Sequence, residues 1–142
     1  MPEIISVELH EPYAATTEQY QVAAKLFYSE IYELPLFDIE SSVASLSRYH
    51  MAAAVRDGKV IGAAELLYNY PNTAFISRLA VDQWNRNEGV GSKLLSCIEQ
   101  AAAMMGSESI SCFPVNESAK LFFLKRKYRP DYSTDRDLIK RF

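Results

Sequence analysis

Residues 79–95 read LAVDQWNRNEGVGSKLL, and this stretch decides how the rest of the chain is interpreted. It begins as the end of an apolar strand, crosses a polar loop and enters a helix that opens with Gly89 and Gly91. The first N–H groups of a helix have no partner within the helix, and the helix dipole places partial positive charge beside them. Glycine has no Cβ, so a ligand can approach the backbone closely. The stretch therefore predicts a phosphate site where the strand passes into the helix.

Two glycines one residue apart also occur in plain tight turns, and this alternative stays open for the loop taken alone. The loop is not a Walker motif, because no Gly-Lys-Ser/Thr follows four residues after a first glycine. It also lacks the third glycine of the dinucleotide-binding fingerprint. The flanking sequence must therefore identify the ligand.

Length and composition restrict the class of protein. A chain of 142 residues predicts a single domain, residues 1–142, with one core. Apolar residues make up 49% of it, which is typical of a folded protein. No run reaches the roughly 20 apolar residues of a membrane helix, and no secretory leader is visible. Cys97 and Cys112 lack metal-ligand spacing and are typical of a reducing compartment, so we expect a cytoplasmic protein without a bound metal or a membrane partner.

The net charge of −3 argues against nucleic acid as a partner. The same charge is compatible with a cationic small molecule or a basic peptide. The sequence therefore favours a small or peptidic ligand over a nucleic acid.

Hydrophobic spacing predicts an alternation of strands and helices. Thr16 and Gln19 form a capping box at the start of the first helix, and Asp38 and Asn116 are placed to cap two later helices. Asp57-Gly58 predicts a hairpin turn. The expected strands are 4–9, 51–55, 60–68, 73–81 and 109–113, with a pair in 128–142, and the expected helices are 16–32, 39–47, 91–105 and 116–127. Only the unit from residue 73 to 113 requires parallel pairing, so a mixed sheet with helices on both faces is expected.

Two motifs in this order resemble those of the GNAT superfamily of acetyl-CoA-dependent N-acetyltransferases. The first is Arg86-x-x-Gly89-x-Gly91, which follows the strand end Leu79-Ala80-Val81. The second is a helix that reads Asn-x-x-Ala-x-x-Phe-Phe over residues 116–123. The resemblance covers nearly the whole chain. It implies an α/β fold with a mixed, mostly antiparallel central sheet, helices on both faces, and fourth and fifth strands that splay apart.

The resemblance also implies where acetyl-CoA binds. Its pantetheine arm would enter between the splayed strands and pair with backbone groups of Leu79 and Val81 as an added strand. N–H groups from about Arg86 to Ser92 would surround the pyrophosphate. The expected cofactor-binding residues are Leu79, Ala80, Val81, Arg86, Asn87, Glu88, Gly89, Val90, Gly91, Ser92, Asn116, Ala119, Phe122 and Phe123.

The implied reaction is direct transfer of the acetyl group to a primary amine of a small molecule or peptide. The Val81 N–H would donate to the thioester oxygen, and Glu65 is a candidate base for the amine proton. An ordinary outward-facing strand residue is the alternative for Glu65. Ser77 is a third catalytic candidate, because strand alternation gives it the parity of Leu79 and Val81. Packing in the core is the alternative for Ser77.

Three residues depart from the family pattern. Phe123 stands where the family usually has the tyrosine that protonates the leaving thiolate, and Asn87 replaces a usual glycine. Glu88 places a carboxylate beside the expected pyrophosphate. These departures keep open a second interpretation, a GNAT-fold domain that binds acyl-CoA or a partner protein with weak or no catalysis. An unrelated α/β binding domain is a third interpretation, and formation of a homodimer is also left open.

Some residues have two interpretations at this level. The basic cluster of the last helix could meet the 3′-phosphate of coenzyme A or form a solvated face; it comprises Lys120, Lys125, Arg126 and Lys127. Four tyrosines could wall the acceptor cleft or simply pack half-buried: Tyr28, Tyr32, Tyr68 and Tyr70. Cys112 is interpreted as a small buried apolar residue rather than a nucleophile, because no histidine neighbours it.

Overall fold

The computed structural model describes residues 5–32, 38–69 and 72–142. A seven-stranded sheet has the order β1-β2-β3-β4-β5-β7-β6, and only the β4–β5 pair is parallel. The strands are β1 (Ser6–His10), β2 (His50–Arg56), β3 (Lys59–Asn69), β4 (Thr73–Val81), β5 (Ser109–Cys112), β6 (Arg129–Pro130) and β7 (Leu138–Arg141). The helices are α1 (Thr17–Leu26), η1 (Phe27–Ile31), α2 (Ile39–Leu46), η2 (Gln83–Asn85), α3 (Val90–Met104) and α4 (Glu117–Leu124).

Polar side chains begin the first helices, as the sequence predicts. The Oγ of Thr16 accepts from the N–H of Gln19 at 3.1 Å, and the Gln19 side chain accepts from the N–H of Thr16 at 3.0 Å. Asp38 accepts from the N–H of Ser41 at 3.0 Å and so caps α2. After Leu26, however, α1 continues as a single π-helical segment, η1, which no local pattern had indicated.

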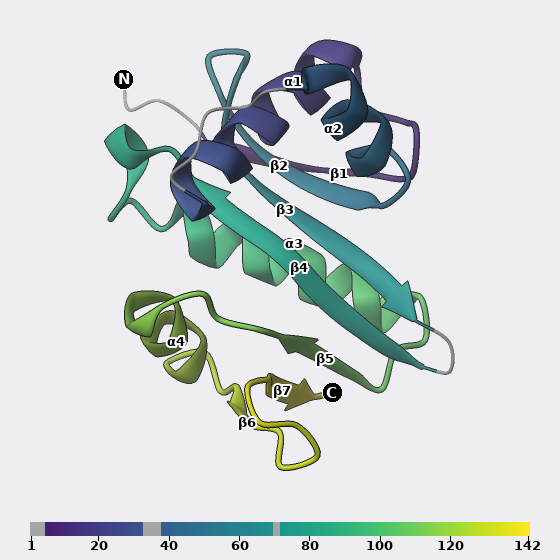
Figure 1. Ribbon diagram of the computed structural model, residues 1–142, viewed down its shortest axis with the longest axis vertical. Coiled ribbons are helices and arrows are strands. Elements are labelled where there is room, and N and C mark those ends of the chain that lie inside the picture. Colours follow the sequence, from purple (N-terminus) through teal and green to yellow (C-terminus); the bar gives the residue numbers. More distant parts are fainter. Residues whose placement is uncertain (1–4, 33–37, 70–71) are drawn as a thin grey trace.

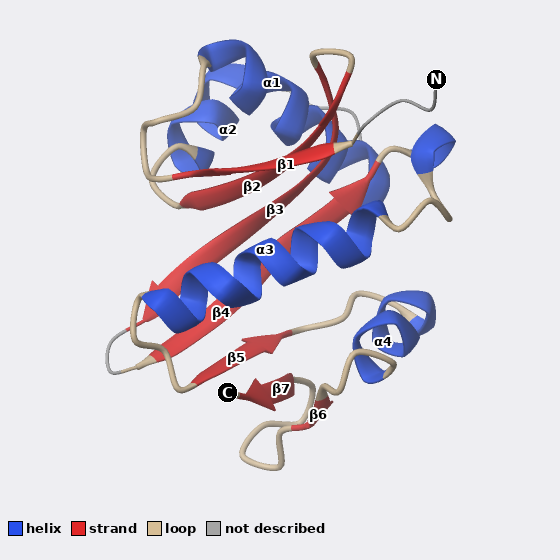
Figure 2. Cartoon of the chain, turned by 180° about the vertical axis from the view of Figure 1, so that it is seen from behind, coloured by secondary structure: helices blue, strands red, loops and turns tan. Residues whose placement is uncertain are grey.

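Helices cover both faces of the sheet (Figures 1 and 2). Helix α3 packs on one face, and α1 with α2 packs on the other. The alternation of β2 shows both contacts, because Ala52 and Ala54 belong to the core under α3 whereas Met51 and Ala53 belong to the core under α1 and α2. A Cβ at Gly62 of β3 would lie 3.0 Å from a methyl carbon of Leu94, so the glycine lets α3 approach the sheet closely.

Strands β4 and β5 separate along their length (Figure 1). Their pairing runs from Thr73 with Ser109 to Ile76 with Cys112, and β4 then continues to Val81 beside a widened gap. Helix α4 follows β5 and lies across this gap from the end of β4 (Figure 2). The expected fold class and the splayed strands are therefore confirmed.

Some predicted features lie outside the described residues. They are the start of the first expected strand at Ile4, and Tyr70, one of the four tyrosines that could wall the acceptor cleft. Within the described ranges, no helix is both long and apolar enough to cross a membrane.

Candidate functional site

The gap beside β4 exposes backbone groups near the strand end. The N–H of Asp82 donates to the carbonyl of Ile61 at 2.8 Å, so these residues form a hydrogen-bonded pair of the antiparallel β3–β4 ladder. Such pairs alternate with non-hydrogen-bonded pairs, and the backbone groups of Val81 and Leu79 therefore point away from β3. They point toward the gap, because β5 pairs with β4 only as far as Ile76. An extended ligand can pair with β4 here.

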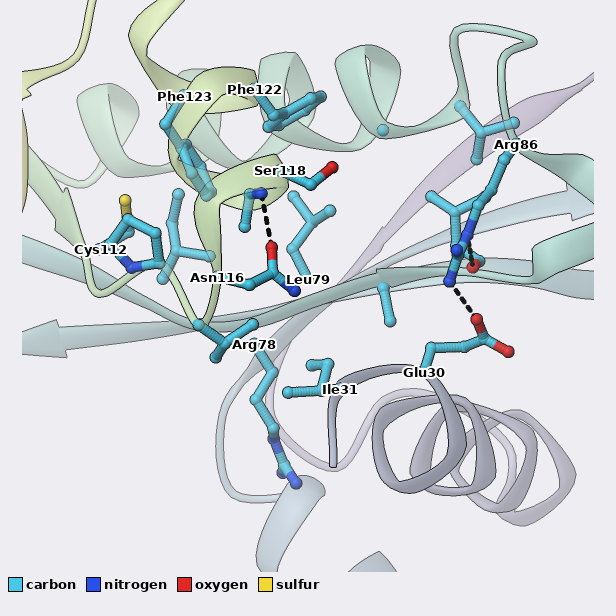
Figure 3. A pocket seen from close by; sticks show the side chains of 18 of the residues that line it. Glu30, Ile31, Arg78, Leu79, Arg86, Cys112, Asn116, Ser118, Phe122 and Phe123 are labelled. Atoms are coloured by element: carbon cyan, nitrogen blue, oxygen red, sulfur yellow. Dashed lines mark hydrogen bonds and ion pairs between the residues drawn. The ribbon is translucent and has the colours of Figure 1, made fainter. Parts of the chain in front are cut away.

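A cavity of about 870 Å³ occupies the gap (Figure 3). Its walls come from the end of β4, the loop after it, the start of α3, η1, the segment after β5, and α4. The predicted site residues that line it are Ser77, Leu79, Ala80, Val81, Arg86, Asn87, Gly89, Val90, Gly91, Ser92, Asn116, Ala119, Phe122 and Phe123. Among the described residues, Glu65 and Glu88 are the two predicted site residues that do not line it.

The loop between β4 and α3 passes through two left-handed residues. Asn87 has a φ of 64° and Gly89 a φ of 79°. After glycine, asparagine is one of the residues that most readily adopts this conformation, so Asn87 provides the backbone geometry of the glycine expected there. Gly89 is the N-cap of α3 and offers no side-chain cap. The first N–H groups of α3 are thereby left for an acceptor at the cavity wall.

Gly91 has a packing role that the sequence did not reveal. A Cβ at Gly91 would lie 3.2 Å from the ring of Phe122 on α4. On the same ring, the guanidinium carbon of Arg126 lies 3.7 Å from the ring centroid. Arg126 also donates to Ser92 Oγ from Nε at 2.8 Å and from Nη2 at 2.6 Å. The missing side chain of Gly91 therefore allows α4 to pack on the start of α3.

Helix α4 presents the second motif to the cavity. The Oδ1 of Asn116 accepts from the N–H of Ala119 at 2.8 Å, which confirms the predicted cap (Figure 3). The buried ring of Phe123 makes edge-to-face contacts with Phe122 and Tyr128, with centroids 5.2 and 5.1 Å apart. Burial and the neighbouring Glu99 carboxylate raise the pKa of Tyr128, whose hydroxyl donates to Glu99 at 2.9 Å. Tyr128 does not line the described cavity, so it does not replace the tyrosine missing at position 123.

Strand β4 contains a bulge at Ser77. Its neighbours Ile76 and Arg78 pair with consecutive residues of β3, so Ser77 faces no partner residue there. The expected parity of Ser77 with Leu79 and Val81 is therefore wrong, because one extra residue shifts the alternation. Ile76 and Leu79 accordingly pack against the same core, on the α3 face.

Glu65 is buried behind the bulge, with 3% of its surface exposed, and the alternative of an outward-facing residue is wrong. It accepts from Arg78 Nε at 3.2 Å, from Arg78 Nη2 at 3.0 Å and from the Ser77 hydroxyl. The guanidinium carbon of Arg78 also lies 4.6 Å from the ring centroid of Phe27. Burial alone would lower the pKa of Arg78, but hydrogen bonds and charge from Glu65, aided by Tyr32, outweigh it and raise the pKa. Glu65 therefore holds Arg78 and the bulge in place.

Glu30 brings to the cavity a carboxylate that the sequence analysis missed. Its Oε2 accepts from Nη2 of Arg86, and the Nε of Arg86 lies 3.4 Å from the carbonyl oxygen of Val81 (Figure 3). Of the described residues that line the cavity, Glu30 is the one Asp or Glu. The expected helix 16–32 contains Glu30, but its π-helical end was not expected, and no local signal could reveal a partner that lies 56 positions away.

The remaining candidates, Cys112 and the tyrosines, differ in whether they line the cavity. Cys112 lines the cavity, but burial and the charge of Asp137 raise the pKa of its thiol to about 12, which supports the interpretation as a small buried residue. Tyr32 lines the cavity and meets Tyr28 edge to face at 5.4 Å. Tyr68 instead donates to the carbonyl of Met105, away from the described cavity. In the described ranges, no group of three His, Cys, Asp or Glu could hold a metal.

Three residues of the basic cluster line a smaller cavity of about 320 Å³, namely Lys125, Arg126 and Lys127. Lys140 lines it too, and its Nζ lies 3.0 Å from a carboxylate oxygen of Glu99. Arg126 also lines the main cavity and belongs to the contact of α3 with α4. Both interpretations of the cluster remain predictions.

Comparisons with known proteins agree with this geometry. The family model described as "Acetyltransferase (GNAT) family" matches residues 9–128, whereas no curated protein matches the chain. An acetyltransferase of Thermus thermophilus is similar, with a TM-score of 0.74 and 17% identity over 99% of this chain and 100% of that one. The PaiA N-acetyltransferase of Thermoplasma acidophilum, in complex with coenzyme A, gives a TM-score of 0.70 and 17% identity over 96% and 99%.

N-acetylglutamate synthase of Neisseria gonorrhoeae, complexed with coenzyme A and N-acetyl-glutamate, gives a TM-score of 0.76 and 16% identity. The match covers 99% of this chain but only 36% of that longer protein. At such identities the likeness to solved structures shows the fold, whereas the family match covers most of the chain.

Proposed function

The chain belongs to the GNAT acetyltransferase family, and we propose that it transfers an acetyl group from acetyl-CoA to a primary amine of a small molecule or peptide. One observation carries the proposal. Leu79 and Val81 direct backbone groups into a gap that ends at the left-handed loop and the start of α3. A hydrogen-bonding strand edge beside a phosphate-sized anion site matches the two chemically distinct parts of coenzyme A.

The chain's own residues suit the proposed cofactor. Backbone groups of Leu79 and Val81 bind the pantetheine arm, and N–H groups from Arg86 to Ser92 bind the pyrophosphate at the positive end of α3. The cavity of about 870 Å³ lies within the range of about 300–1,000 Å³ that is typical of ligand sites. The opposite wall is α4, through Asn116, Ala119, Phe122 and Phe123.

Acetyl-CoA supplies the activated acetyl group, and the chain stabilises its transfer. The Val81 N–H donates to the thioester oxygen, which gains negative charge as the amine nitrogen bonds to the carbonyl carbon; one such donor is typically worth about 3 kcal/mol. The carbon–sulfur bond would break, and the thiolate would take a proton from water because Phe123 has none to give; the proton that the amine loses to the base would return to that water and balance the step. The amine loses its proton to a base.

We assign that base to Glu30 rather than Glu65. Glu30 lines the cavity and lies two hydrogen bonds from Val81 through Arg86. Glu65 does not line the described cavity, and both of its oxygens accept from Arg78 or Ser77, whereas the contact of Glu30 with Arg86 involves Oε2 alone. A general base must reach its proton directly or through one water, so geometry favours Glu30.

A second candidate function is binding of acyl-CoA, or of a partner protein, without catalysis. The observation that favours it is Phe123, which stands at the position of the usual acid and is held by edge-to-face contacts with two other rings. Both functions use the same loop, so cofactor binding alone does not separate them.

Two measurements test the proposal in sequence. Titration with acetyl-CoA should raise the free energy of unfolding by about 2.7 kcal/mol at a ligand concentration of 100 Kd. Trp84, the single tryptophan of the chain, is 83% exposed next to the loop and can report binding by fluorescence. Release of free thiol with a panel of amines then measures transfer. A protein that is not stabilised by acetyl-CoA would contradict the proposal, and stabilisation without thiol release would favour the non-catalytic function.

A further inference from the structure

Glu88 faces away from the cavity and toward the end of β2. Its Oε2 lies 2.5 Å from Nη2 of Arg56, the last residue of β2. The Nη1 of Arg56 donates to Oδ1 of Asn85 at 2.7 Å. One arginine, 29 and 32 positions distant, therefore holds two residues of the loop that begins the anion site.

The charge of Glu88 conflicts with the ligand that its own loop is built to hold. Its neighbours Asn87 and Gly89 both line the cavity, so the carboxylate belongs to a residue whose backbone borders the anion site. An uncompensated carboxylate within the Debye length of about 10 Å repels a pyrophosphate. The arginine at 2.5 Å removes most of that repulsion.

We propose that Arg56 is a positioning residue for the pyrophosphate of coenzyme A, which cancels the Glu88 charge and fixes the loop from outside the cavity. This inference rests on the proposed function. Arg56 does not line the described cavity and touches no reacting group, so it acts through Glu88 and Asn85.

The local charges show why a single cation matters. Residues 79–95 carry two acidic and two basic side chains, and contacts from outside add Glu30, Arg56 and Arg126. The seven charged groups are Asp82, Arg86, Glu88, Lys93, Glu30, Arg56 and Arg126. Four are positive and three negative, so loss of Arg56 removes the one excess positive charge around the proposed pyrophosphate.

The test measures coenzyme A affinity by calorimetry in a double-mutant cycle. Arg56→Gln leaves the Glu88 carboxylate uncompensated, and we expect the Kd to rise about tenfold, within the usual range of coupling between sites. Glu88→Gln removes the repulsive charge and should bind at least as tightly as the wild type. Arg56→Gln combined with Glu88→Gln should return the Kd to within about threefold of the wild type.

Two further variants separate charge from folding. Arg56→Lys keeps the positive charge, so most of the affinity should remain even though one fork of hydrogen bonds is lost. Lys59→Gln removes an exposed cation from the same hairpin without touching the loop and should leave the Kd unchanged. Thermal unfolding of each variant checks that the protein is folded.

The outcomes are distinct. A wild type that does not bind coenzyme A overturns the proposed function, and this inference with it. If the wild type binds and Arg56→Gln binds equally well, only the inference fails. If the double variant binds as weakly as Arg56→Gln, charge cancellation is wrong, because removal of Glu88 should then have restored affinity.

Discussion

The two walls of the cavity are built in different ways. The proposed cofactor wall, residues 79–95 with 116–126, presents mainly backbone conformation, caps and helix ends to the cavity, although Arg56 and Arg126 hold it through contacts with distant residues. The proposed acceptor wall, η1 with the bulged middle of β4, depends on side-chain pairs between distant parts of the chain. Arg78 meets Glu65 from 13 positions away, and Arg86 meets Glu30 from 56.

The backbone geometry of one wall can be shared by proteins of different sequence, whereas the paired side chains of the other wall are particular to this chain. A backbone site needs only a few glycines, caps and left-handed residues, so different side chains can produce it, as Asn87 does in place of glycine. A wall of paired charges depends on each partner, and losing one leaves the other uncompensated. Specificity for the acceptor should therefore depend on the second wall.

The largest expected effect comes from breaking the acceptor wall at Glu65. Glu65→Ala leaves the half-buried Arg78 without its carboxylate partner. Loss of one partner of a fully buried pair typically costs about 3–5 kcal/mol, so the lower end of that range applies here. We expect the free energy of unfolding in urea to fall by about 3 kcal/mol. Glu40→Ala, at an exposed helix position, is the matched control and should change it by less than about 0.5 kcal/mol.

The same variant also tests whether the walls are independent. If Glu65 supports only the acceptor wall, folded Glu65→Ala should keep the coenzyme A affinity of the wild type. A loss of affinity similar to that of a loop variant would show that the bulge also sets the position of Leu79 and Val81.

The sequence predicted the cofactor wall because its signals are local. The caps at Thr16, Asp38 and Asn116 and the order of strands and helices follow from spacing and turn residues, whereas the splayed pair was implied by the resemblance to the family. The acceptor wall escaped prediction because its geometry depends on distant contacts. No glycine or proline near Ser77 indicates a bulge in the sequence. Simple alternation along the strand therefore assigned the Ser77 side chain to the wrong face of β4.

The next prediction concerns kcat, which we expect to fall when the Glu30 carboxylate is removed. Glu30→Gln keeps the size of the side chain but removes the proton acceptor, and loss of a general base typically lowers kcat by about 10²–10⁴-fold. Coenzyme A affinity should not fall, because Arg86 loses a competing carboxylate. Steady-state kinetics with an amine found in the panel would measure kcat. An unchanged kcat in Glu30→Gln would assign proton removal to another group or to water.

Gly91 probes the cofactor wall directly. A side chain at Gly91 meets the Phe122 ring as well as the expected phosphate, so Gly91→Val should cost about 1–3 kcal/mol from overpacking and weaken coenzyme A binding about tenfold or more. Calorimetry and urea unfolding separate the two losses. Gly91→Ala adds only the Cβ that meets the ring, and combining it with Phe122→Leu removes that clash. If the double variant binds coenzyme A as tightly as the wild type does, Gly91 serves packing between α3 and α4 and not the approach of the ligand.

The smallest expected effect tests the residue that departs most from the family pattern. The leaving thiolate of coenzyme A is tolerable without an acid, since an alkyl thiol with a pKa near the cysteine reference of about 8.5 gives a weakly basic anion and hence a good leaving group. Phe123→Tyr adds a hydroxyl on the ring that lines the cavity, and a modest increase of kcat, about threefold to tenfold, is expected. The Kd for coenzyme A should change little, because the proposed phosphate contacts lie on the loop.

Phe122→Tyr is the matched control for the added hydroxyl. The Phe122 ring is covered by Arg126 and lies against Gly91, so an oxygen there should not reach the thiolate and kcat should stay as in the wild type. An equal increase in both variants would point to a general effect on α4 rather than to proton donation. If neither form of position 123 releases thiol with any amine while both bind acetyl-CoA, the non-catalytic function explains the chain better, because an enzyme that lacks only its acid should still turn over slowly.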